Sequence, residues 1–188
     1  MSWGEKMHSR KMIKILSVSL ILSLFLCSCT SKTAYANTLA SACDTMIIGC
    51  GQAETVLNKV LAVWHNSIFK IDDEETDAYT KDSDHSGDFY EDFNDALSCL
   101  YLHADFSASI DEIRENQSQV ISLMQSLRNP PKGYEEAYKS AVEFYDTYCE
   151  LTNLAITHSG SYNSVSEDFS NLDNTCLQQY YKMQLYLG

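Results

Sequence analysis

Proline and glycine are scarce in this chain. Its 188 residues include 2 prolines and 7 glycines, and no segment is of low complexity. β-Sandwiches and β-barrels need a turn after every short strand, and most tight turns depend on these two residue types. The composition therefore argues against a turn-rich β-protein, and the lack of biased segments argues against a disordered one.

Basic residues are also few. The chain has 13 lysines and arginines against 26 aspartates and glutamates, for a net charge of −13. Residues 1–28 hold four of the basic residues and one of the acidic ones, so the chain without them carries −16. Such a surface repels phosphate backbones and anionic lipid head groups. We therefore expect no nucleic-acid partner, and a single domain large enough to bury a core.

Long apolar runs are missing as well. A membrane span takes about 20 apolar residues, whereas the run 13–26 is shorter and contains Lys14. Arg10 and Lys11 precede this run. A basic segment followed by a short apolar one is typical of a secretory signal.

The apolar run ends in Leu26-Cys27-Ser28-Cys29, which resembles the lipobox of bacterial lipoproteins. In that motif a cysteine behind a small residue is lipidated and becomes the first residue of the mature protein. Cleavage before Cys29 places Ser28 at the position before the cut, whereas Cys27 would follow the bulky Leu26. The alternative, ordinary secretion with cleavage after Ala36, lies far beyond the apolar run.

The lipobox resemblance implies lipidation at Cys29 and a protein anchored on the extracytoplasmic side of the cell membrane. Lipoproteins of this class carry two or three acyl chains, which hold a protein more firmly than one. We therefore divide the chain into a signal peptide, 1–28, a lipidated N-terminus with a short tether, 29–37, and a helical domain, 38–188.

Cysteines beyond Cys29 are odd in number: Cys43, Cys50, Cys99, Cys149 and Cys176. Cys43 and Cys50 lie seven residues apart on one predicted helix, about 10 Å along its axis and too far to be joined. A Cys149–Cys176 disulfide stays open as an alternative. We expect most of these thiols to serve as small buried hydrophobes, which suits a reducing habitat.

Apolar residues recur every three or four positions along most of the chain, as in amphipathic helices. The first such seam comprises Leu39, Cys43, Met46, Cys50, Ala53, Leu57, Val60, Trp64, Ser67 and Ile71. An acidic segment, 72–88, follows and is expected to be a solvated connection.

Further seams predict the remaining helices. Phe89, Phe93, Ala96 and Leu100 mark a second helix, and Phe106, Ile110, Ile113, Gln117, Val120, Met124 and Leu127 mark a third that could continue the second as one kinked rod. Tyr134, Tyr138, Ala141, Tyr145, Tyr148, Thr152 and Ala155 mark a fourth, and Val165, Phe169, Leu172, Cys176, Met183 and Tyr186 a fifth.

Cap and turn residues delimit these helices. Asp105, or Ser109 with Glu112, is expected to cap the third helix, and Ser164 with Glu167 to form a capping box at the last one. Gly160 is expected to end the fourth. The short connections 129–133 and 159–163 favour antiparallel neighbours. The predicted fold is therefore an all-α, antiparallel up-and-down bundle of four to five helices.

The C-terminal third resembles uncharacterised small helical-bundle lipoproteins of Gram-positive bacteria. The resemblance rests on Asn129-Pro130-Pro131, Tyr134, Ala137-Tyr138, Tyr145, Leu151-Thr152, Ser159-Gly160-Ser161 and Ser166-Glu167-Asp168-Phe169. It implies the bundle and the anchor, and it implies no reaction or binding residues.

One segment partly matches a calcium-binding loop, with oxygen-bearing side chains at the first, third and fifth positions and glycine at the sixth. The weak candidate ligands are Asp82, Asp84, Ser86 and Asp88. The twelfth position should be glutamate and is Phe93. We therefore expect no metal site there, and read the segment as an acidic linker in which Ser86 or Asp88 caps the next helix.

Other chemical patterns are incomplete. Cys99 and His103 have the spacing of half a zinc site but lack a second pair. Ser67-Ile68-Phe69-Lys70 and Ser161-Tyr162-Asn163 match fragments of penicillin-binding enzymes without the third element. No histidine of the mature chain follows a glutamate by three residues, as di-iron bundles require. We therefore expect no catalytic residues and no cofactor.

Tyrosines on the last two predicted helices are the remaining candidates for a binding groove, although such rows more often belong to a core. They are Tyr134, Tyr138, Tyr145, Tyr148, Tyr180, Tyr181 and Tyr186. The function expected from the sequence is a non-enzymatic binding module with an unknown protein or surface partner. The alternative is a small-molecule or metal-binding lipoprotein serving a sensor or transporter.

The expected anchor depends on one sulfur atom. Cys29→Ala should release the protein to the medium or leave the uncleaved precursor, because the lipid-accepting thiol is gone, whereas Cys27→Ala should keep membrane attachment. Cell fractionation and mass spectrometry of the N-terminus measure both outcomes. An unmodified N-terminus at Asn37 in the wild-type protein would contradict the assignment.

Overall fold

The computed structural model describes the backbone of residues 3–82 and 87–187, and the side chains of 31–82 and 87–187. These residues form helices and no strand, apart from an isolated bridge between Lys81 and Phe89. The helices are α1 (Trp3–Phe69), α2 (Asp77–Thr80), α3 (Phe93–Leu102), α4 (Ala104–Ser126), α5 (Glu135–Ile156) and α6 (Tyr162–Leu187). The all-α prediction is confirmed, with a short helix, α2, that the seams did not indicate.

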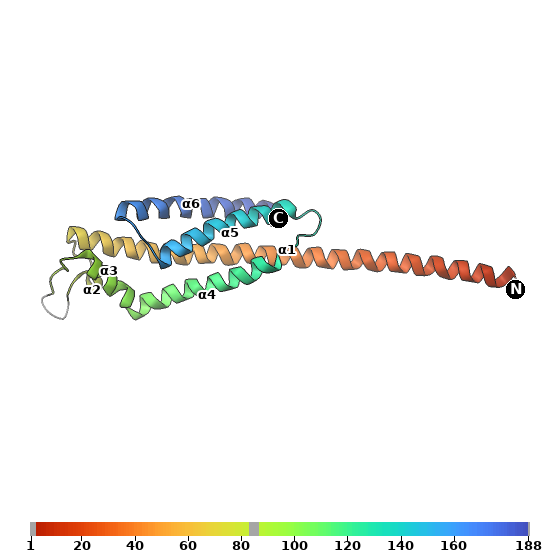
Figure 1. Cartoon of the computed structure of the whole chain (residues 1–188), viewed down its shortest axis with the longest axis horizontal. Coiled ribbons are helices and arrows are strands. Elements are labelled where there is room, and N and C mark those ends of the chain that lie inside the picture. Colours follow the sequence, from red (N-terminus) through yellow and green to blue (C-terminus); the bar gives the residue numbers. More distant parts are fainter. Residues whose placement is uncertain (1–2, 83–86, 188) are drawn as a thin grey trace.

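Four long helices lie side by side, and the N-terminal part of α1 projects beyond them (Figure 1). Helix α1 packs against α4, α5 and α6, and α5 packs against α6 and α4. Among the described residues, α4 and α6 do not contact each other. Helices α1 and α5 therefore form the centre of the domain, with α4 on one side and α6 on the other.

The first predicted seam is the core-facing side of α1. All of its residues from Leu39 to Ser67 are buried, and most are completely shielded from solvent. The last position is wrong, because Lys70 adopts a left-handed backbone with φ of 55° and the helix ends at Phe69. Ile71 consequently lies outside the helix and is 40% exposed.

Helix α1 also runs through the segment predicted to be a tether, 29–37. Tyr35 is buried there, and its hydroxyl donates a hydrogen bond of 3.0 Å to the carbonyl oxygen of Leu127. Its ring meets that of Tyr134 edge to face, with 5.2 Å between centroids. The end of this segment is therefore part of the bundle, held by the connection between α4 and α5.

The acidic segment 72–88 is not the fully solvated connection that its composition predicts. Thr76 and Thr80 are buried, and Asn66 donates hydrogen bonds of 2.9 Å to both Asp73 and Thr76. Lys81 forms ion pairs with Asp72 and Asp77 at 2.6 and 2.8 Å. These polar contacts fold the segment back onto the end of α1, which the charge pattern alone could not reveal.

The predicted caps are partly wrong. Helices α3 and α4 are separate, because His103 between them has an extended backbone with ψ of 131°. His103 precedes α4 without a side-chain cap, so neither Asp105 nor Ser109 has the predicted capping role. Asp92, rather than Ser86 or Asp88, caps α3 by accepting a 2.9 Å hydrogen bond from the amide of Asn94.

The capping box of α6 lies three residues earlier than predicted. The hydroxyl of Ser161 accepts from the amide of Ser164, and the hydroxyl of Ser164 accepts from the amide of Ser161, at 3.2 and 3.0 Å. Such reciprocal bonds satisfy amides that a helix start leaves without partners. Gly160 has a φ of 120° and precedes this box, whereas α5 already ends at Ile156.

A buried polar contact joins three helices at the centre of the bundle. Tyr148 of α5 donates a 2.6 Å hydrogen bond to the side-chain oxygen of Asn116 of α4, and the Asn116 amide donates to the carbonyl oxygen of Thr45 of α1 at 3.0 Å. Tyr148 is fully buried and Asn116 nearly so. The approach requires glycine at position 49, because a β-carbon there would lie 2.7 Å from the Tyr148 ring and closer still to Asn116.

Gly49→Ala is therefore expected to destabilise the protein by about 1–3 kcal/mol, the usual cost of overpacking a core. Urea unfolding monitored by circular dichroism measures this loss. The matched control is Gly51→Ala on the same helix, where the new methyl group meets no atom within 4 Å. Alanine has the higher helix propensity, so the control should be stabilised by up to about 1 kcal/mol. Equal effects at the two positions would contradict the close contact.

Candidate functional site

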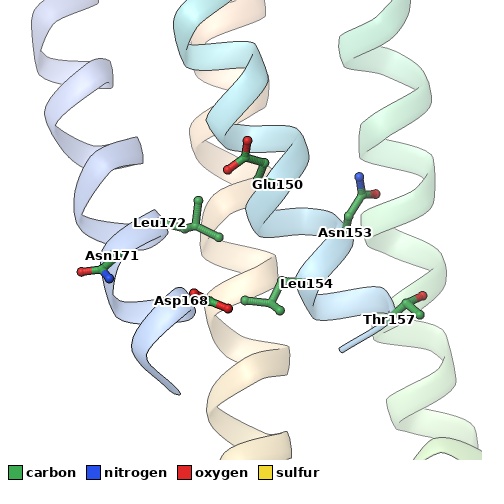
Figure 2. Close-up of a pocket in the computed structure, with 7 residues that line it drawn as sticks. All are labelled: Glu150, Asn153, Leu154, Thr157, Asp168, Asn171 and Leu172. Carbon is green, nitrogen blue, oxygen red and sulfur yellow. The ribbon is translucent and has the colours of Figure 1, made fainter. Parts of the chain in front are cut away.

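An open cleft of about 750 Å³ lies between the end of α5 and the start of α6 (Figure 2). Its volume falls in the range typical of ligand sites, about 300–1,000 Å³. It is lined by Glu150, Asn153, Leu154, Thr157, Asp168, Asn171 and Leu172. Within each helix they recur at spacings of three and four residues, so they share one face over adjacent turns.

The lining combines apolar and acidic side chains. Figure 2 shows Leu154, Leu172 and Asp168 pointing into the space between the two helices. The two leucines are partly buried, whereas the carboxylates of Glu150 and Asp168 are exposed and come from opposite helices. Carboxylates above an apolar surface suit a cationic group on an apolar stem, because ammonium and guanidinium groups pair with carboxylates while the stem packs on hydrocarbon.

One side of the cleft is braced by α4. The side-chain amide of Gln117 donates hydrogen bonds to the hydroxyl of Thr152 at 2.9 Å and to the side-chain oxygen of Asn153 at 3.1 Å. Thr152 is fully buried, and its hydroxyl donates in turn to the carbonyl oxygen of Tyr148 at 2.8 Å. Asn153 is therefore fixed relative to the central polar contact of the bundle.

Sequence reasoning missed this cleft. Leu172 was expected to face inward, but no seam or motif singled out Glu150 or Asn171, and Asp168 entered only through the family resemblance. The residues that line this cleft come from two helices, and packing determines how these helices are rotated relative to each other. The spacing of residues within one helix does not reveal which residues of the other helix they meet. The one local signal is Leu154, an apolar residue outside the predicted seam.

The tyrosines divide between core and surface. Tyr148 is fully buried, Tyr134, Tyr138, Tyr145 and Tyr180 are partly buried, and Tyr181 and Tyr186 are 62% and 39% exposed. Two of them, Tyr138 and Tyr145, line a smaller cleft of about 250 Å³ between α4 and α5. The row is therefore not one continuous groove.

The other candidates are dispersed. Cys99 donates a weak 3.8 Å hydrogen bond to the carbonyl oxygen of Ala78, and His103 meets the ring of Tyr79 edge to face at 5.3 Å. Ser67 is buried, and the ammonium group of Lys70 donates to the carbonyl oxygen of Tyr90. These contacts are structural, and they leave neither Cys99 nor Ser67 in a constellation for catalysis.

The calcium-loop candidates are only partly described. The amide of Asp82 donates to the carbonyl oxygen of Asp88 at 2.9 Å, whereas Asp84 and Ser86 lie outside the described residues. Within 31–82 and 87–187, no three histidine, cysteine or acidic side chains converge as metal ligands would. The side chain of Cys29 also lies outside the described part, so its lipidation stays a prediction.

Aromatic side chains gather where α1 ends and α6 begins. The Trp64 ring lies 5.8 Å from that of Phe93, 5.5 Å from the His158 imidazole and 6.0 Å from Tyr162. The Tyr101 hydroxyl is 2.9 Å from Nδ1 of His158. Burial lowers the pKa of His158, because the protonated imidazole loses hydration among these rings.

Comparison with protein-family models, with curated proteins and with solved structures finds no match. The resemblance to Gram-positive lipoproteins therefore stays a prediction. Over the described residues, no helix is both long enough and apolar enough to cross a membrane.

The environment of His158 makes stability depend on pH. Its folded-state pKa lies below the ordinary value of about 6.5, so the unfolded chain binds the proton more readily. The free energy of unfolding should therefore fall as the pH is lowered from 7 towards 5. His158→Gln cannot ionise and should lose less stability over that interval. Urea midpoints at both pH values test this, and identical losses in the two proteins would contradict the role of His158.

Proposed function

We propose that this protein is a non-enzymatic binding module that captures a cationic peptide segment of a surface protein in the α5–α6 cleft. The observation that carries the proposal is the lining of the cleft, in which Glu150 of α5 and Asp168 of α6 lie towards opposite ends and the partly buried Leu154 and Leu172 lie between them. A lysine or arginine with an apolar neighbour matches this lining in both charge and hydrophobicity.

We further propose that the module is a lipoprotein of the cell membrane, anchored at Cys29 on the extracytoplasmic side after removal of the signal peptide 1–28. The basic and apolar N-terminal segments and the lipobox-like sequence support this assignment. The helical domain that follows, from about residue 38, would be an up-and-down bundle in which successive long helices reverse direction, as Figure 1 draws them.

The position of the cleft agrees with this orientation. It lies near the start of α6, where Tyr162 contacts Trp64 close to the end of α1. At about 1.5 Å per residue, the stretch of α1 from Leu39 to Phe69 carries that end about 45 Å from the anchored end. The cleft would thus face away from the membrane, and the charge of −16 would attract cationic segments to it.

A second candidate function is the capture of a small amine for a sensor or transporter. The volume of the cleft favours it, because about 750 Å³ is also the size of a small-molecule site. The cleft is also open to solvent along two helices, which suits an extended peptide equally well. Competition between a peptide and free amines for the cleft distinguishes the two functions.

The test compares two double variants that lose the same charge. Glu150→Gln with Asp168→Asn removes the carboxylates of the cleft, and Glu112→Gln with Glu115→Gln removes two exposed carboxylates of α4. The probe is a fluorescent peptide of alternating lysine and leucine, measured by anisotropy. The cleft variant should bind about five- to thirtyfold more weakly, from two ion pairs of about 0.5–1 kcal/mol each.

The α4 variant should bind the peptide nearly as well as the wild-type protein, because it keeps both carboxylates of the cleft. Since the two variants lose the same net charge, the comparison removes the effect of the long-range field. Equal weakening would show that net charge alone attracts the peptide. Unchanged binding in the cleft variant would show that the peptide binds elsewhere.

A further inference from the structure

Two buried thiols meet between α1 and α6. The Cys50 side chain lies against that of Cys176, and the two are respectively 3% and 1% exposed. The contact agrees with the antiparallel packing of these helices, because further along the same pair Tyr180 donates a 3.3 Å hydrogen bond to Asp44. The sequence had suggested Cys149 as the alternative partner of Cys176.

Cys149 has another environment. It shares a hydrogen bond with Tyr145 on its own helix and is only partly buried. Burial is the largest cause that raises its pKa. Cys149 therefore serves as an internal control for the thiol pair.

Of the four long helices, α6 buries the fewest side chains in the core. Over its 26 residues the fully buried side chains are Val165, Cys176 and Met183, whereas α5 buries eight side chains over 22 residues. Few buried apolar contacts allow a segment to open locally at low cost in free energy. A covalent link at Cys176 would fasten this helix near the middle of its length.

We propose that Cys50 and Cys176 form a disulfide that locks α6 onto α1 when the chain folds in an oxidising compartment. The proposal rests on the proposed export of the protein, and it adds a redox-dependent state to the bundle that displays the cleft. The cleft is affected because one of its walls is α6.

The chemistry is a thiol–disulfide exchange with a disulfide-bearing oxidant, either an oxidoreductase or a small disulfide such as oxidised glutathione. The Cys176 thiolate attacks one oxidant sulfur, forming a mixed disulfide and releasing the other sulfur as a thiolate. The Cys50 thiolate then attacks Sγ of Cys176 and releases the first oxidant sulfur. One S–S bond is broken and one is formed, and the two thiol protons pass to the reduced oxidant.

The folded reduced protein should resist this reaction. Contact with the Cys176 thiol and burial both raise the pKa of Cys50, so the reactive thiolate is rare while α6 is docked. Oxidation should therefore occur during folding or when α6 opens. Whether the disulfide is present would consequently depend on the redox conditions under which the chain folded.

The experiment uses the full chain purified in detergent, refolded with either oxidised glutathione or a reductant. Peptide mapping of the oxidised protein should find a Cys50–Cys176 link, and amide hydrogen exchange in α6 should slow at least about tenfold relative to the reduced protein. Cys149→Ser should leave both results unchanged. Cys50→Ser should abolish both while keeping the helical signal in circular dichroism.

Mapping of the wild-type protein does not depend on the folding of any variant. A Cys149–Cys176 link, or free thiols at both Cys50 and Cys176 after oxidative refolding, would overturn the proposal. Because these measurements are made in solution, they separate the lock from export, which Cys29→Ala tests. Loss of peptide binding in the cleft variant is independent of both.

Discussion

The close contact of α1 with α4 and α5 at Gly49 fixes the relative positions of the three helices. Apolar seams allow helices to slide by a turn at modest cost, because one methyl group replaces another. The hydrogen bonds of Asn116 to Tyr148 and to the Thr45 backbone remove that freedom, since a shifted register would leave buried polar groups without partners. The positions of Thr152, Gln117 and Asn153 follow from this contact.

Three of the few basic residues, Lys59, Lys70 and Lys81, act at the end of α1 that carries the acidic segment. Lys81 pairs with two aspartates, Lys59 donates to the carbonyl oxygen of Glu75, and Lys70 reaches the carbonyl oxygen of Tyr90. These contacts hold the acidic segment against the end of α1. Exposed pairs of this kind are weak individually, so the buried Asn66–Thr76 hydrogen bond is the contact that excludes water and sets the geometry.

The sequence predicted the helices better than their connections. A seam such as Leu39 to Ser67 predicts the buried side of a helix well, because the same spacing of apolar residues recurs at many positions. The folding of 72–82 depends on Asn66 and Lys59, which belong to α1 and match no sequence pattern that predicts such contacts. The α5–α6 cleft and the Cys50–Cys176 contact could not be predicted for a similar reason. Both depend on which faces of two helices meet.

Helix α1 runs without a break from the segment proposed to carry the anchor, 29–37, into the core, and this course determines how the domain bears a mechanical load. A force applied at the N-terminus acts along the axis of α1, parallel to its interfaces with α4 and α6. The contacts from Tyr35 to Ser67 then resist in shear and share the load, instead of opening one after another as they would if α1 were peeled away. A domain pulled in this direction should withstand larger forces than one pulled at the C-terminus, where the sparsely anchored α6 peels from its end.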